Sequence, residues 1–308
     1  MRTAGMSTTS KSPKRILQVA HAIGKQRLRA YWHKFSPKKF TVPQLFACLV
    51  LKEFLGFDYR KFTALLEDAP ELADCIGLKC VPHFTTLHKA AGRLLVSRRV
   101  SVLLDETVAQ AAAHKIIKKK VALAAIDGTG FETRHISAYF VRRRDRACKT
   151  GYQTTTYTRF PAANLICDCH SHIVLAVVTG RGPGPDDPYF APTLKQAAGR
   201  AQIGTLLADA GYDSERAHRL AREEYGMLTV IPPLRGRPTT KPFRGHWRQR
   251  MKTHFDKKKY GQRWQVETVN SMIKRLLSSA LRARTYWSQS REIALRVLTH
   301  NIMILRRA

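Results

Sequence analysis

The sequence predicts an α/β core over residues 120–308, preceded by an all-α region over residues 13–119. Helical periodicity recurs before residue 120, whereas no strand-like alternation of apolar and polar residues occurs there. After residue 120, short apolar runs alternate with helical patterns, which is typical of a sheet covered by helices. Residues 1–12 are small and polar, and we expect them to form a disordered tail.

Helix signals divide the all-α region into short elements. Thr41 precedes an apolar run with Pro43 in its first turn, and Gly56 follows that run, as at the two ends of a helix. Ser97 is a candidate N-cap for the last helix of the region. We expect helices at residues 13–33, 41–55, 58–67, directly after Pro70, 84–95 and 98–118.

The segment 82–93 has the polar residues that a DNA-recognition helix needs. Such side chains on one helix face can contact a groove or phosphates, as in a helix-turn-helix. The alternative is a plain helical bundle that packs on the next domain. We expect residues 13–119 to bind DNA through some part of this region. The candidate contacts are Thr85, Thr86, His88, Lys89 and Arg93.

Two apolar runs have the length of buried strands, and each ends on an aspartate. Residues 121–126 precede Asp127, and residues 203–208 precede Asp209. A carboxylate at the tip of a buried strand is costly unless it is paired or bound to metal. A crossover between the runs would place the strands side by side in parallel, so we expect the two aspartates to lie close together.

The remaining patterns of the core alternate between strands and helices. Alternation on both sides of residues 170–172 predicts a hairpin, and Ser214 is a candidate N-cap. Residues 232–255 are basic and rich in Pro and Gly, so we expect a short extended insertion there. We expect strands at 162–169, 173–179 and 227–231, and helices at 188–199, 215–225 and, as an amphipathic closing element, 290–306.

Residues 260–274 place complementary polar side chains on one face if they form a single helix. A carboxylate flanked by cations suits a site that binds metal ions and phosphates. The ordinary alternative is that Arg263 and Glu267 form an i,i+4 pair on the surface. The residues that share a narrow stripe at 100° per residue are Tyr260, Arg263, Glu267 and Lys274.

Asp127, Asp209 and Glu267 together suggest a metal site. The order of elements allows the helix with Glu267 to cover the strand ends that carry the two aspartates. Three converging carboxylates can hold two divalent ions, which can drive in-line attack at a phosphodiester. Mg²⁺ suits carboxylate and water ligands, and Mn²⁺ can substitute. Each carboxylate also has an ordinary alternative, as a turn residue or as part of the surface pair.

Basic residues greatly outnumber acidic ones: 54 Lys and Arg against 22 Asp and Glu give a net charge of +32. Such an excess calls for an anionic partner, and nucleic acid is the leading candidate. The longest apolar run, residues 45–51, is far shorter than the roughly 18 residues of a membrane span, so we expect no membrane partner. Six scattered cysteines favour free thiols in a reducing cytoplasm.

A second cluster, Cys167, Cys169, His170 and His172, raises the alternative of a zinc site. Alternate residues of a strand face the same side, so the two cysteines would share a face. The usual C-x2-C spacing is absent and no second pair of ligands is evident, which argues against zinc.

The pattern Tyr260-x2-Arg263-x3-Glu267-x6-Lys274 resembles the Y-R-E-K signature of bacterial insertion-sequence transposases of the DDE type. Asp127 in IDGTG and Asp209 in ADAGYDS resemble the first and second catalytic aspartates of that family. The resemblance covers residues 120–305, and the helical region resembles the family only in kind.

The resemblance implies a ribonuclease-H-like, retroviral-integrase-like catalytic core with magnesium-dependent cleavage of transposon ends and joining to target DNA. Asp127, Asp209 and Glu267 would be the metal ligands, and Tyr260, Arg263 and Lys274 would contact DNA phosphates. It also implies a homodimer in the active complex and a place in the bacterial nucleoid. Two alternatives remain open: a catalytically inactive DNA-binding regulator, and a metal-dependent nuclease without strand transfer.

Overall fold

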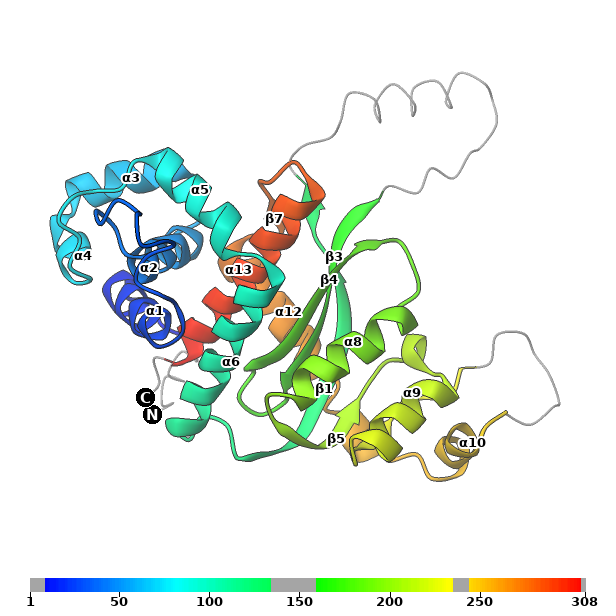
Figure 1. Ribbon diagram of the computed structural model, residues 1–308. Helices are drawn as coiled ribbons and strands as arrows, with labels where there is room; N and C mark the ends of the chain where they lie inside the picture. Colours follow the sequence, from blue (N-terminus) through cyan, green and yellow to red (C-terminus); the bar gives the residue numbers. More distant parts are fainter. Residues whose placement is uncertain (1–8, 134–158, 235–243, 306–308) are drawn as a thin grey trace, which may run out of the picture.

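The computed structural model describes residues 9–133, 159–234 and 244–305, and it joins a helical part to an α/β part (Figure 1). The described residues ahead of the sheet contain helices and no strand. Most of these helices lie within a few residues of the predicted positions, but the first and the last end earlier. They span Pro13–Arg27 (α1), Val42–Phe54 (α2), Tyr59–Asp68 (α3), Pro70–Asp74 (α4), Phe84–Leu94 (α5) and Ser97–Ala113 (α6).

Side-chain caps explain where several of these helices begin. Ser12, Thr41 and Asp58 each accept a backbone N–H hydrogen bond at the N-cap position of α1, α2 and α3. The prediction that Ser97 caps α6 is wrong. Ser97 is the first helical residue, Val96 occupies the N-cap, and no side chain caps this helix.

The chain just before α1 is held by the last helix of the fold. Ser10 is fully buried, and its backbone N–H donates to the carbonyl oxygen of Met303 at 2.9 Å. Its hydroxyl oxygen accepts from the backbone N–H of Ser12 at 3.1 Å. The disordered tail predicted over residues 1–12 therefore does not reach Ser10, while residues 1–8 lie outside the described part of the chain.

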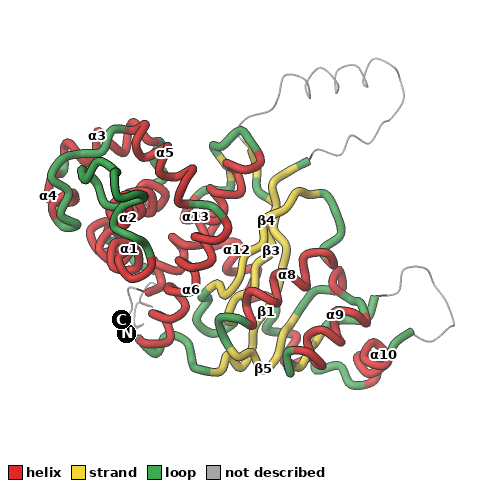
Figure 2. The backbone as a smooth tube through the Cα atoms, in the orientation of Figure 1, coloured by secondary structure: helices red, strands yellow, loops and turns green. Residues whose placement is uncertain are grey.

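A mixed five-stranded sheet forms the centre of the α/β part, in the order β4-β3-β1-β5-β6 (Figure 2). β3 runs antiparallel to β1 and β4, whereas β5 is parallel to β1 and β6. The predicted parallel pairing of the two apolar runs is confirmed, because Ala125 pairs with Leu207 in parallel register. The strands are β1 (Lys120–Gly130), β3 (Phe160–Asp168), β4 (Val174–Gly182), β5 (Gln202–Leu207) and β6 (Leu228–Val230), with β2 (Glu132–Thr133) and β7 (Ala280–Leu281) in a separate pair.

Helices cover both faces of this sheet. α8 lies on one face, and α12 lies with α13 on the other (Figures 1 and 2). Ser214 caps α9 as predicted, because its hydroxyl accepts from Ala217 N–H at 3.1 Å, and the helix continues as a π-helical turn, η2. The helical elements are α8 (Asp187–Ala198), η1 (Ala210–Tyr212), α9 (Glu215–Arg219), η2 (Leu220–Glu224), α10 (His246–Thr253), α11 (Lys257–Tyr260), α12 (Trp264–Leu277) and α13 (Tyr286–Leu305).

The last helix, α13, ties the helical part to the sheet. It begins at Tyr286, earlier than the amphipathic helix predicted at 290–306, and all its residues from 293 to 305 are buried. A helix that is buried all round packs between elements instead of covering one surface. α13 contacts α2 and α6 on one side and β3 and β4 on the other. The hydrophobic core therefore runs across the boundary predicted at residue 120.

Buried polar side chains of α13 fix this packing. Arg296 is only 2% exposed and pairs with Glu53 of α2 at 2.9 Å and with Glu292 at 2.7 Å. Asn301 binds the backbone of Val174 at the start of β4, accepting from its N–H and donating to its carbonyl oxygen, both at 2.9 Å. Because a buried charge or amide is costly without partners, these bonds specify where α13 lies.

The basic insertion predicted to be extended over 232–255 contains a helix, α10, so the prediction is wrong for residues 246–253. Arg248 of α10 forms an ion pair with Asp213 at 2.6 Å. The backbone N–H groups of Trp247 and Arg248, the second and third residues after the glycine N-cap, donate to Glu215 at 3.1 Å each. Asp213 and Glu215 flank the start of α9, so α10 is clamped against that helix.

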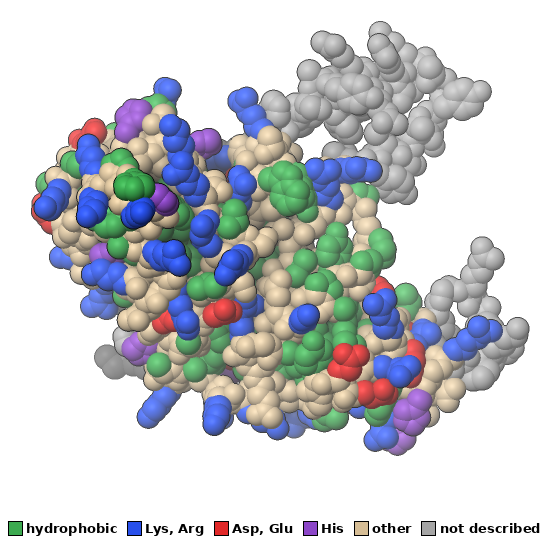
Figure 3. Space-filling model, in the orientation of Figure 1, with side chains coloured by type: hydrophobic (Ala, Val, Ile, Leu, Met, Phe, Trp, Pro, Cys, Tyr) green, Lys and Arg blue, Asp and Glu red, His purple; other side chains and the backbone are tan. Residues whose placement is uncertain are grey.

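Basic side chains are spread over the face of the molecule that Figure 3 shows, and acidic ones gather most densely near α8 and α9. The surface of the helical part on this face is therefore mainly basic, and a basic surface attracts anionic partners. Among the helices that the structure describes, none is long and apolar enough to cross a bilayer.

Candidate active site

The register of β1 and β5 brings Asp127 and Asp209 to one edge of the sheet. The pairing of these strands ends at Ala125 and Leu207, and each aspartate follows its paired residue by two positions. Adjacent strands lie about 4.8 Å apart, so the two side chains start from neighbouring backbone positions. Asp127 does not follow the end of its strand as predicted, because β1 continues beside β3 to Gly130.

Two side chains from the α12 segment contact Asp127. The amide Nδ2 of Asn270 donates to its Oδ2 at 3.0 Å. The Nη1 of Arg263 lies 4.0 Å from its Oδ1. The side chain of Asp127 is 20% exposed, so these contacts act in a partly desolvated setting.

Acidic side chains lie around Asp127: Glu267 lines the same pocket, Asp209 follows the neighbouring strand, and Asp186 lies beside Gly128. Burial raises the pKa of Asp127 from its ordinary value of 3.8 to about 6. The guanidinium of Arg263 opposes this rise, whereas the carboxylates of Glu267, Asp209 and Asp186 add to it. Like charges raise a carboxyl pKa when they lie near it. The structure thus places the three sequence-predicted carboxylates in one neighbourhood and adds a fourth.

The prediction of one continuous helix over 260–274 is wrong at its start. α11 ends at Tyr260 and α12 begins at Trp264, so Tyr260 and Glu267 lie on different helices. Arg263, at the N-cap of α12, still reaches Glu267, with Nη2 2.5 Å from Oε1. Its guanidinium lies 5.9 Å from the centre of the Tyr260 ring. The apolar face of α12 packs through Val266, Val269, Met272 and Ile273, whereas Leu276, which the helical periodicity places on the same face, is 45% exposed.

Lys274 lies beside the carboxylates, two turns after Glu267. It lines a pocket of about 310 cubic ångströms together with Asp127 and Glu267. Its Nζ lies 5.7 Å from the centre of the Phe131 ring, a distance at which a cation is attracted to an aromatic face. The pocket is completed by Thr129, Asn270, Ser271 and Arg275. Acidic and basic groups therefore line the same small surface.

The side chains of this edge fit a hard divalent cation in their chemistry, because such ions prefer oxygen ligands. Within residues 9–133, 159–234 and 244–305, no three acidic, His or Cys side chains lie close enough together to hold an ion as they stand. Arg263 instead supplies the positive charge, pairing with Glu267. Asn270 is 6% exposed, and its Oδ1 has no hydrogen-bond partner among the described residues. An unpaired buried acceptor beside repelling carboxylates fits a hydrated cation.

The part of the chain that builds this edge matches a known family. Residues 120–302 match the family model described as the transposase DDE domain. The chain belongs to this family. The prediction of an insertion-sequence DDE transposase is thereby confirmed, although the match does not by itself show the Y-R-E-K signature. A comparison with curated proteins finds no match.

The protein is a DNA transposase, an enzyme that cleaves DNA and transfers the cut strands. Transposases of this family depend on metal ions, and two-metal chemistry is typical of them. The DDE domain implies a ribonuclease-H-like fold, and the mixed sheet with helices on both faces agrees with it. The family match favours the transposase over the regulator and the simple nuclease that the sequence left open.

Sequence patterns do not single out three side chains of the transposase site: Asn270, Tyr212 and Asp186. Tyr212 is fully buried and donates to Asn164 of β3 at 2.7 Å. A signal for Asn270 exists, since it follows Glu267 by three positions and so lies on the same side of α12. Asp186 has no local signal, because its place at the site depends on how α8 packs on the sheet.

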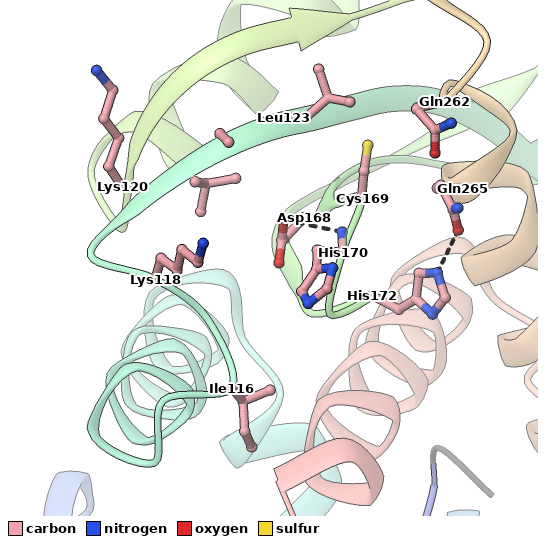
Figure 4. A pocket seen from close by; sticks show the side chains of 12 residues that line it. Ile116, Lys118, Lys120, Leu123, Asp168, Cys169, His170, His172, Gln262 and Gln265 are labelled. Atoms are coloured by element: carbon pink, nitrogen blue, oxygen red, sulfur yellow. Dashed lines mark hydrogen bonds between the residues drawn. The ribbon is translucent and has the colours of Figure 1, made fainter. Parts of the chain in front are cut away.

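The cluster of Cys167, Cys169, His170 and His172 lies elsewhere, near the start of α12. Cys169 and the two histidines line a separate pocket of about 450 cubic ångströms (Figure 4). A ring nitrogen of His172, Nε2, hydrogen-bonds Oε1 of Gln265 at 2.7 Å. Cys167 is fully buried and does not line the pocket. Within the part of the chain that the structure describes, these four side chains do not form a group that could hold a metal ion as they stand.

Proposed function

We propose that Asp127, Asp209 and Glu267 are the catalytic carboxylates of this transposase and bind two Mg²⁺ ions, for which Mn²⁺ can substitute. The observation that supports this proposal best is the position of Asp127, which shares the Arg263 guanidinium with Glu267 and lies on the strand beside the one that leads to Asp209. When bound, two such ions activate the attacking oxygen and stabilise the leaving oxygen of a phosphodiester.

Neighbouring side chains orient one of these carboxylates and neutralise the charge of another. Asn270 fixes the orientation of Asp127 through the 3.0 Å hydrogen bond to its Oδ2. Arg263 neutralises Glu267 in the free protein through their 2.5 Å contact. A DNA phosphate is a strong competitor for a guanidinium, because it accepts two parallel hydrogen bonds. DNA binding thus releases Glu267 from Arg263 and frees its carboxylate for a cation.

Tyr260, Arg263 and Lys274 are the proposed contacts to phosphates near the transposon end. The side chains of Arg263 and Lys274 lie beside the acidic side chains, where the scissile phosphodiester must lie for the reaction. Tyr260 is half-buried, with its ring 5.1 Å from that of Phe255. Its hydroxyl is the group that can donate to a phosphate oxygen.

The helical part supplies further DNA contacts, with α5 as the recognition helix. One face of α5 is buried against its neighbours, which fixes the helix in place. The opposite face is polar and basic, as a helix that enters a groove requires. The exposed side chains of that face are Thr85, His88, Lys89 and Arg93, and Thr86 is half-buried.

The active complex is a homodimer with a retroviral-integrase-like core in each subunit, and it acts on DNA of the bacterial nucleoid. Transposition joins two transposon ends to one target, so two active sites must work in the same complex. The net charge of +32 supports a protein that stays bound to DNA through contacts to the phosphate backbone.

A cleavage assay tests the assignment of the three carboxylates. The substrate is DNA with the inverted repeats that flank the coding region, in Mg²⁺, with the joining of cut ends followed in the same reaction. We expect Asp127→Ala, Asp209→Ala and Glu267→Ala to abolish cleavage and joining while end binding persists. Asp187→Ala, an exposed neighbouring change, should cleave normally. Cleavage by all three variants would reject the assignment.

A further inference from the structure

A carboxylate that the proposed mechanism does not use, that of Asp186, lies at the same edge of the sheet. Asp186 occupies the N-cap of α8, where an aspartate normally accepts a hydrogen bond from the first turn of the helix. Its side chain makes no such bond. The carboxylate therefore does not cap α8, although Asp186 occupies the N-cap position.

Two glycines make room for this carboxylate between the strand ends. A Cβ atom on Gly128, the residue after Asp127, would lie 2.8 Å from Oδ1 of Asp186. A Cβ atom on Gly211, two residues after Asp209, would lie 3.3 Å from Oδ2. Each oxygen of Asp186 thus lies against the backbone beside one of the two aspartates.

An independent observation points to a ligand at this edge. Asn270 is buried, and its Nδ2 donates to Asp127, but its Oδ1 has no partner among the described side chains and backbone groups. A buried acceptor without a donor is costly in a protein interior. A cation with its bound water would supply a donor to Asn270 and positive charge to the carboxylates.

We infer that Asp186 is a fourth carboxylate of the cation site and lies between Asp127 and Asp209. This inference rests on the proposed function, because it takes those two aspartates as cation ligands. Octahedral Mg²⁺ or Mn²⁺ keeps several waters, so an additional carboxylate can bind the ion directly or through one of its waters. In either arrangement Asp186 increases the affinity for the ion before DNA arrives.

Binding of Mn²⁺ to the full chain without DNA tests the inference, with the free ion followed by electron paramagnetic resonance. We expect Asp186→Asn to weaken Mn²⁺ binding at least about tenfold, as loss of a ligand or its hydrogen-bonded support does. The matched control is Asp187→Asn. Asp187 is the next residue, is exposed and accepts from the Ser214 hydroxyl at 2.7 Å, so its removal should leave affinity within about twofold.

The variant Asp127→Asn tests the proposed cation site separately from the role of Asp186 in it. If Asp127→Asn loses Mn²⁺ while Asp186→Asn binds it like the wild type, the proposed function stands and the role of Asp186 is overturned. If Asp127→Asn also binds normally, the cation site itself is placed wrongly and the inference falls with it.

A second measurement does not depend on the folding of any variant. Fe²⁺ in place of Mg²⁺, with ascorbate and peroxide, cuts a protein backbone close to the bound ion. We expect the wild-type chain to be cut near residues 127, 186 and 209, with excess Mg²⁺ suppressing all three cuts. Cutting near 127 and 209 without cutting near 186 would overturn the inference.

Discussion

Replacing Asp127 with asparagine tests the electrostatics of the site without DNA. The pKa of Asp127 is raised from 3.8 to about 6, so the folded protein holds this proton more tightly than the unfolded chain does. Stability of the metal-free protein therefore falls as the pH rises from about 4 to above 6. Each pKa unit corresponds to about 1.4 kcal/mol, so the ionised side chain costs the fold about 3 kcal/mol near pH 8.

Asparagine carries no charge at any pH, so the variant escapes this cost. We expect the unfolding free energy of Asp127→Asn, relative to the wild type, to increase by about 2 kcal/mol between pH 4 and pH 8. The measurement is urea unfolding in EDTA at both pH values, followed by circular dichroism. Titrating groups far from Asp127 cancel, because only the difference between the two proteins is compared.

The control variant for this experiment is Asp187→Asn, which removes an exposed carboxylate nearby. Its unfolding free energy relative to the wild type should be the same at both pH values. Adding Mn²⁺ at pH 8 should stabilise the wild type and leave Asp127→Asn unchanged. A constant difference between Asp127→Asn and the wild type across this range would refute the argument that burial, with the neighbouring carboxylates, raises the pKa of Asp127.

Four further substitutions test other parts of the structure. Arg263→Ala and Lys274→Ala should weaken binding to transposon-end DNA and each lower the slope of log affinity against log salt by about one; an unchanged slope in filter binding would exclude phosphate contact. Asn270→Ala should slow cleavage about tenfold or more without weakening DNA binding, because a hydrogen bond to a charged group contributes about 1.5–3 kcal/mol; single-turnover kinetics would show it. Arg296→Ala should lower the unfolding free energy by about 3–5 kcal/mol, since it leaves Glu53 buried without its arginine.

The strand pairing of the core could be predicted because its signals are local. Two apolar runs that each end on an aspartate, separated by a helical pattern, leave few topologies open. The structure places these strands in parallel, with Asp127 and Asp209 in matching positions. The starts of α2 and α9 were predictable for the same reason, since Thr41 and Ser214 cap them.

The details of the site depend on contacts between distant residues. A projection at 100° per residue assumes an unbroken helix, but Gly261 follows Tyr260 as the C-cap of α11. The pairing of Arg263 with Glu267 survives this break because Arg263 follows it, at the N-cap of α12 with helical backbone angles. Asp186 reaches the site through the packing of α8 on the sheet, which no short pattern encodes. Helix α10 likewise depends on the acidic residues around α9.

The burial of α13 on every side has a consequence for how the protein is made. The ribosome completes this helix after every other described element, so neither the helical part nor the sheet can close its interior on a growing chain. Both halves must then fold together in one late step. A transcript cut short before Tyr286 would give a product with open apolar surface, which chaperones and proteases remove, and not a stable fragment that competes for the transposon ends.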